Sequence, residues 1–140
     1  MNETILNSTA FKLHRATLLI DRIADDYLQQ HHGIRYAPML VLLMARLLGP
    51  TSQQKIAENL GVSRASVSQR VTPLVAEGLL EIEKLDGRTH RVTLTDHGRE
   101  VFDAAWAGLE SHQSPLDDGV DEAALAAQLD RLIANGMALL

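Results

Sequence analysis

The chain has 140 residues, a length that suits one domain with a hydrophobic core of its own. Its hydrophobic content of 46% and charged content of 22% argue against long disorder or a collagen-like repeat, and the absence of cysteine excludes disulfides, thiolate catalysis and iron–sulfur clusters. The formal net charge of −5 argues against a nucleic-acid partner unless the basic side chains are concentrated in one segment.

The start of the chain lacks the features of a secretory signal, since Asn2 and Glu3 stand where basic residues and then an apolar stretch would be needed. The longest apolar run, residues 39–48, is interrupted by Arg46 and is much shorter than the roughly 20 residues that span a bilayer. We therefore expect a cytoplasmic protein without a membrane segment.

Two helices are predicted in the first third of the chain. Residues 10–31 have the period of an amphipathic helix, with an apolar stripe of Leu13, Ala16, Ile20, Ile23 and Tyr27. This helix should end near Gly33. A second helix is predicted over residues 37–48, where Pro38 is tolerated because it lies in the first turn.

A pair of shorter helices follows. The first is predicted over residues 52–59 and opens on a capping box formed by Thr51 and Gln54. Ser63 is the expected cap of the second, which spans residues 64–77.

These two helices have the residue spacing of a helix-turn-helix. Small Ala57 falls where the helices would cross, Gly61 suits a left-handed turn, and Val67 supplies a β-branched core contact. Pro73 removes the N–H that would bond to the Gln69 carbonyl, so the second helix should kink or end near that point.

The rest of the chain predicts a hairpin and two more helices. Residues 80–95 alternate between apolar and polar side chains on both sides of Asp86-Gly87, which is typical of two strands joined by a tight turn. Thr95 caps a helix that should end before Pro115, and a last helix spans residues 121–139. The expected fold is mainly α with a small β-hairpin wing.

The charge is unevenly distributed along the chain. Residues 50–99 carry seven basic and six acidic side chains, a net charge of +1, whereas the other 90 residues carry six basic and twelve acidic ones. The predicted second helix and hairpin also expose polar and basic side chains: Arg64, Ser66, Gln69 and Arg70, then Arg88, His90 and Arg91. A solvated helix face would look similar, but the helix-turn-helix spacing favours DNA binding.

At this point the residues from Gly33 through Gly98 resemble the multiple-antibiotic-resistance-regulator (MarR) family of winged helix-turn-helix repressors. The most specific parts are Ser63 to Val71, Glu77 to Leu80, the wing sequence Asp86-Gly87-Arg88, and Leu94 to Gly98. The resemblance covers nearly the whole chain.

The resemblance implies a single domain over residues 1–140. Residues 1–33 and 100–140 would form a helical dimerisation region, and residues 34–99 the winged helix-turn-helix region. A homodimer would then act as a transcriptional regulator, and by this resemblance as a repressor, on a pseudo-palindromic operator of roughly 16–20 base pairs of double-stranded DNA.

Each part of the winged region then has an expected place on DNA. The helix over residues 64–77, which begins after Ser63, would enter the major groove and read bases through Arg64, Ser66, Gln69 and Arg70. The start of the preceding helix would contact phosphate through Thr51, Ser52 and Gln53. The wing over residues 85–91 would lie in the minor groove, with His90 beside it. In the family the wing arginine, here Arg88, enters that groove while the aspartate, here Asp86, holds its guanidinium.

Relatives of this kind often release DNA when a small aromatic or phenolic acid binds between the dimerisation and winged regions. The candidate lining residues are His14, Arg15, Tyr36, Met39 and Trp106. Core packing is the commoner explanation of Met39 and Trp106, and a solvated helix face is the commoner explanation of His14 and Arg15.

Other functions receive less support from the sequence. There is no G-x-S-x-G, Gly-rich phosphate loop or H-E-x-x-H motif, so we expect no enzyme, cofactor or metal site. His112 has Gly108 one turn before it, where a zinc-binding helix would need a second ligand. A winged domain that binds only another protein stays open as the alternative.

Overall fold

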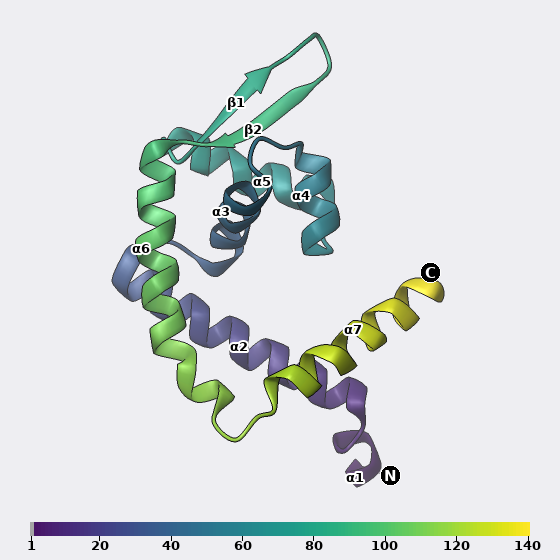
Figure 1. The fold of residues 1–140 in the computed structure, drawn as a ribbon. Coiled ribbons are helices and arrows are strands. Elements are labelled where there is room, and N and C mark those ends of the chain that lie inside the picture. Colours follow the sequence, from purple (N-terminus) through teal and green to yellow (C-terminus); the bar gives the residue numbers. More distant parts are fainter. Residues whose placement is uncertain (1) are drawn as a thin grey trace.

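The computed structural model describes residues 2–140 and is mainly helical, with one two-stranded antiparallel sheet (Figure 1). In chain order the elements are α1 (Asn2–Leu6), α2 (Thr9–His32), α3 (Tyr36–Leu48), α4 (Gln53–Leu60), α5 (Arg64–Ala76), β1 (Leu80–Lys84), β2 (His90–Leu94), α6 (Asp96–Gln113), the 3-10 turn η1 (Ser114–Asp117) and α7 (Glu122–Ala138). The expected fold class is confirmed, and the short α1 is an addition to the predicted elements.

The hydrophobic core lies in the winged part of the chain. Helix α3 is at its centre, between α4 and α5 on one side and α6 on the other (Figure 1). The predicted contacts Ala57 and Val67 are both buried, as the helix-turn-helix spacing required. The fully buried large side chains come from every element of this part: Met39, Val41, Leu42, Ile56, Val67, Val71, Leu80, Val92 and Leu109.

Serine and threonine caps set the starts of three helices in this region. The Ser63 hydroxyl accepts a hydrogen bond from the Ser66 N–H at 3.0 Å, as expected, and Thr95 caps α6 in the same way. The expected capping box at α4 is wrong, because the cap is Ser52, whose hydroxyl accepts from the Lys55 N–H at 3.1 Å. Thr51 has another role, because its backbone pairs with Val92 of β2 and extends the small sheet.

Helix α5 runs without interruption through Pro73 to Ala76. The helix therefore does not end at the proline, one of the two outcomes expected from the sequence. Pro73 and Gln69 are both exposed, so water can reach the Gln69 carbonyl that loses its partner. The cost of the missing hydrogen bond is thereby kept small.

The hairpin forms as the sequence predicts. Strands β1 and β2 pair in antiparallel register, with Leu80 opposite Leu94 and Glu83 opposite Arg91. Leu80 and Val92 point into the core, while the outer part of β1 is exposed. The hairpin tip projects beyond the helical body (Figure 1).

The helices at the two ends of the chain bury little. Helix α2 buries only Ala24 and Leu28, while Ala16 and Ile20 of the predicted apolar stripe are exposed and its other members are half-buried. Helix α7 buries no residue. The large apolar side chains left exposed on α1, α2, η1 and α7 include Ile5, Leu6, Leu18, Leu19, Ile20, Leu116, Leu125, Leu132, Ile133 and Met137.

Across residues 2–140, none of the helices has both the length and the apolar composition required to cross a membrane.

Candidate nucleic-acid interface

The exposed face of α5 is the first component of the candidate interface. Val67, Val71 and Leu74 attach the helix to the core, and the opposite face is open to solvent. Helix α4 packs across α5, and between them Gly61 adopts a left-handed conformation with φ of 70° that a glycine accommodates without strain. This is the geometry of a helix-turn-helix.

Four side chains dominate that exposed face: Ala65, Ser68, Gln69 and Thr72. Of the predicted readers, Gln69 and Arg64 are exposed, and Ser66 is half-buried. The sequence analysis missed Ser68 and Thr72, although their spacing around Gln69 on the helix would have indicated them. The Thr72 hydroxyl donates to the Ser68 carbonyl at 3.2 Å, which fixes its orientation.

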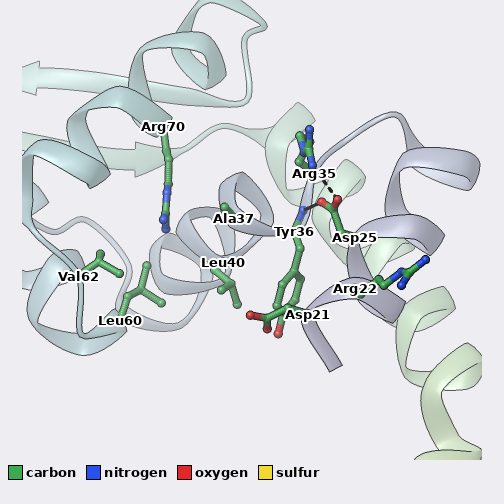
Figure 2. A pocket seen from close by; sticks show the side chains of 10 residues that line it. All are labelled: Asp21, Arg22, Asp25, Arg35, Tyr36, Ala37, Leu40, Leu60, Val62 and Arg70. Carbon is green, nitrogen blue, oxygen red and sulfur yellow. Dashed lines mark hydrogen bonds and ion pairs between the residues drawn. The ribbon is translucent and has the colours of Figure 1, made fainter. Parts of the chain in front are cut away.

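Arg70 does not lie on this face. It is half-buried and lines a pocket between α5, α3 and α2 (Figure 2). The structure therefore places Arg70, a predicted base reader, at this pocket rather than on the exposed face. The reason is rotational, since Arg70 is turned by about 100° from Gln69 around the helix axis.

The start of α4 presents a second candidate contact. Ser52 is exposed and caps the helix, and Gln53 is half-buried beside it. The unpaired N–H groups of this first turn point out of the helix, as at any α-helix start. The backbone of Thr51 is already paired, because both its N–H and its carbonyl are bonded to Val92.

The wing tip is organised by Asp86. Its Oδ1 accepts hydrogen bonds from the backbone N–H of Arg88 at 2.9 Å and of Thr89 at 2.8 Å. The resemblance seen in the sequence implied that this aspartate holds the arginine guanidinium. Over the described residues the structure instead shows two ion pairs, and neither involves Asp86 or Arg88. Asp86 therefore shapes the turn, and the Arg88 side chain is left exposed beside His90.

The two N–H groups also affect the acidity of Asp86. The hydrogen bond from the Arg88 backbone, followed by that from Thr89, lowers the pKa of the Asp86 carboxyl below its usual value of 3.8. A carboxyl whose pKa is lowered on folding contributes stability above its unfolded pKa and loses it as the pH falls through the folded value. The turn should therefore stay ordered down to pH values below 3.8.

An NMR titration tests this wing turn. We expect the Asp86 carboxyl to titrate below 3.8, and the amide protons of Arg88 and Thr89 to shift with the same midpoint. In the variant Asp86→Asn the amide oxygen can still accept these bonds, so the turn should persist without the titration. Asp86→Ala should lose both features. If Asp86 titrated at its ordinary value, its proposed control of the turn would be refuted.

A pocket of about 520 Å³ lies where α2 meets the winged part of the chain (Figure 2). Its lining residues are Asp21, Arg22, Asp25, Arg35, Tyr36, Ala37, Leu40, Leu60, Val62 and Arg70. Asp25 ties the two parts together, because it accepts from the Tyr36 backbone N–H at 2.9 Å and from the Arg35 guanidinium at 2.9 Å. The hydrogen bond from the Tyr36 backbone has the larger effect, and together with the bond from Arg35 it lowers the pKa of Asp25.

Tyr36 presents a neutral hydroxyl to the pocket. Burial, and then the nearby negative charge of Asp21, raise the pKa of Tyr36 above its usual value of 10.0. The tyrosine is therefore protonated at neutral pH and can donate a hydrogen bond to a bound molecule.

Only Tyr36 of the five predicted ligand-lining residues is in this pocket. Met39 is fully buried in the core, and Trp106 stacks on Phe102 while its indole N–H donates to Glu110 at 2.6 Å. His14 and Arg15 are exposed on α2, away from the pocket. The charged lining residues were missed because they come from segments far apart in the chain.

The described residues contain no cluster of three histidine or carboxylate side chains that could hold a metal ion.

Comparison with known proteins agrees with this geometry. Residues 49–81 match the family described as winged helix-turn-helix DNA-binding. A MarR-family transcriptional regulator from Silicibacter pomeroyi has a similar structure, with a TM-score of 0.82, 23% identity, and coverage of 96% of this chain and 94% of that one. This chain has the fold of the MarR-family regulators. The resemblance expected from the sequence is thus confirmed.

Two further similar structures were solved with a bound molecule. MosR of Mycobacterium tuberculosis, solved in complex with DNA, has a TM-score of 0.80 and 18% identity, covering 95% of this chain and 98% of that one. CouR of Rhodococcus jostii RHA1, bound to p-coumaroyl-CoA, has a TM-score of 0.80 and 20% identity, covering 91% of each chain.

A curated relative is also named as a transcriptional regulator. An uncharacterized HTH-type transcriptional regulator of Bacillus cereus is 27% identical over 119 residues, which are 85% of this chain and 80% of the relative. These relatives are named as regulators rather than enzymes. The family model and the curated relative support a DNA-binding regulator of the helix-turn-helix type, and the solved structures show the shared fold.

Proposed function

We propose that the chain is a transcriptional repressor that binds a pseudo-palindromic operator as a homodimer. The observation that carries this proposal is the exposed polar face of α5 together with an exposed arginine in the wing. The wing is a hairpin that projects from the helical body (Figure 1). An α-helix with polar side chains on its outer face fits the major groove of B-DNA, and a hairpin beside it can reach the neighbouring minor groove.

In this proposal α5 reads the bases. The Gln69 amide can bond to adenine in two places, and the Arg64 guanidinium can do so to guanine. The hydroxyls of Ser66, Ser68 and Thr72 supply shorter contacts, and the Ala65 methyl fits beside a thymine methyl. Backbone N–H groups at the start of α4, with Ser52 and Gln53, would bind phosphate and set the orientation of the helix.

The wing supplies the minor-groove contact through Arg88, with His90 close by. Replacing Arg88 with Ala should weaken operator binding by about 1–3 kcal/mol, because a guanidinium is lost from a narrow and electronegative groove. A gel-shift titration measures this change. The matched control is Arg99→Ala, which removes an exposed arginine from α6 and should leave affinity nearly unchanged. Equal binding by the Arg88 variant and the parent would contradict the assignment.

Dimerisation is proposed because one winged domain contacts too few base pairs to be selective. The exposed apolar side chains of α1, α2 and α7 supply a surface for a second copy, in residues 1–33 and 100–140. A two-fold dimer would place the two α5 helices about one DNA turn apart, on a site of roughly 16–20 base pairs.

In vitro selection of bound duplexes from a random pool tests the function as a whole. We expect an enriched site with two-fold symmetry, and an affinity that falls steeply as salt is raised, because phosphate contacts release counterions. Failure to enrich any sequence would favour the alternative, a winged domain that binds another protein. Enrichment of an asymmetric site would retain DNA binding and reject the dimer.

We also infer that a small aromatic compound bound in the Tyr36 pocket releases the operator. The pocket lies between α2, which belongs to the proposed dimerisation region, and the helices that would contact DNA (Figure 2). A ligand that changed the angle between these parts would change the spacing of the two α5 helices. The structure of CouR with p-coumaroyl-CoA supports an aromatic ligand for this fold.

A further inference from the structure

Helix α5 contributes residues both to the candidate DNA-binding face and to the pocket. Its exposed face carries Gln69, and the next residue, Arg70, extends into the pocket toward Leu40 and Val62 (Figure 2). A single rigid helix therefore joins the candidate base reader to the pocket lining. Any force applied to the Arg70 side chain by a bound molecule acts directly on the helix that would lie in the major groove.

The arginine side chains that line the pocket differ in whether a carboxylate already pairs with them. The Arg35 guanidinium is paired with Asp25 at 2.9 Å, so a ligand would have to compete with a carboxylate for it. The Arg22 guanidinium points away from Arg70 (Figure 2). Among the ion pairs of the described residues, none includes Arg70. Arg70 is therefore the cation that an incoming anion can use at the lowest cost.

The opposite end of the pocket carries a negative charge instead of a positive one. There the Asp21 carboxylate and the Tyr36 hydroxyl lie near each other, and Leu40 separates them from Arg70 (Figure 2). A carboxylate repels a second negative charge but accepts a hydrogen bond from a neutral hydroxyl. The pocket thus suits a flat apolar body with an anionic group at one end and a hydrogen-bond donor at the other.

We propose that Arg70 is the residue that recognises the anionic group of the effector and transmits its binding to α5. This inference rests on the proposed regulatory function and specifies how the pocket acts. In the half-buried pocket a charged hydrogen bond to the guanidinium is stronger than at the surface, and it pulls α5 toward α3. The Gln69 face then moves relative to the second copy of the helix, and the operator is released.

A matched pair of probes tests the role of Arg70. The probes are 4-hydroxybenzoate and the uncharged 4-hydroxybenzamide, with binding to the full chain measured by calorimetry. We expect the parent to prefer the benzoate about tenfold or more, and Arg70→Gln to reduce this preference to about twofold or less. Arg70→Lys keeps the charge and should keep most of the preference. Arg99→Gln removes an exposed arginine outside the pocket and should change nothing.

Operator binding without any probe completes the test, using the selected DNA site. Arg70→Gln should bind the operator within about threefold of the parent, whereas Gln69→Ala should lose about tenfold or more. Benzoate should release the operator from the parent but not from Arg70→Gln. Circular dichroism establishes that both variants are folded.

Three results would overturn the inference. One is an unchanged preference for benzoate in Arg70→Gln, and another is a loss of operator affinity in that variant as large as in Gln69→Ala. The third is failure of the parent to bind either probe, which would also remove the aromatic effector. The parent's affinity for its selected operator is measured separately, so DNA binding is judged independently of all three.

Discussion

The double variant Leu125→Glu/Leu132→Glu is expected to be monomeric and to lose at least about 100-fold in operator affinity, because linking two half-site readers raises affinity by two to four orders of magnitude. Both leucines lie on one face of α7, seven residues apart, and each is more than 40% exposed within the single chain. Two carboxylates on that face would be buried without partners in a dimer. Sedimentation and fluorescence anisotropy with the selected operator measure the two effects.

The control places the same charges on the other side of the helix. Ala127→Glu/Ala134→Glu adds two carboxylates to α7 about half a turn away from the leucines. This variant should stay dimeric and bind the operator like the parent. A dimer of unchanged mass in the leucine variant would show that α7 does not form the interface.

The expectation for α7 follows from its lack of support within the chain. An isolated helix of this length is marginal in water, and most helical stability in proteins comes from packing of an apolar face. Helix α7 spans 17 residues and buries none of them. In the proposed dimer, the exposed apolar side chains of α2 from a second copy would cover the apolar face of α7.

The elements of the winged part could be predicted from the sequence because their burial lies within the chain. In α5 the buried positions Val67, Val71 and Leu74 repeat at helical spacing, and the Ser63 cap marks the start. In α2 the same periodicity predicted the apolar stripe, but Ala24 and Leu28 are the residues packed inside the chain, while Ile20 of the stripe stays exposed. Periodicity shows which face is apolar, but it does not show which molecule covers that face.

The candidate site was predicted less completely than the fold, for a related reason. A polar residue on a helix can face a DNA groove or a pocket, and the sequence could not place Arg70 at the pocket because only the position of α3 distinguishes the two. The pocket itself joins Asp21 to Arg70 across 49 positions of the chain. Spacing rules apply within one helix, so they could not bring these residues together.

Replacing Gly98 with Ala is expected to destabilise the fold by about 3 kcal/mol, the upper part of the usual range for overpacking a filled site. Gly98 is buried in the first turn of α6, where a Cβ would overlap the backbone oxygen of Leu79 and come within 2.9 Å of the Leu94 side chain. The Leu79 oxygen cannot move aside freely, because it accepts the Thr95 N–H at 3.1 Å. Urea unfolding measures the loss.

A second glycine separates this steric effect from the general effect of adding a methyl group. At Gly87 in the wing a Cβ would meet no atom within 4 Å, and the backbone does not adopt a positive φ. Gly87→Ala should therefore change stability by less than about 1 kcal/mol. The Leu79 oxygen, the Thr95 cap and Gly98 together join β1 to the start of α6, so a loss of similar size in both variants would mean that this junction does not hold the wing to the helical body.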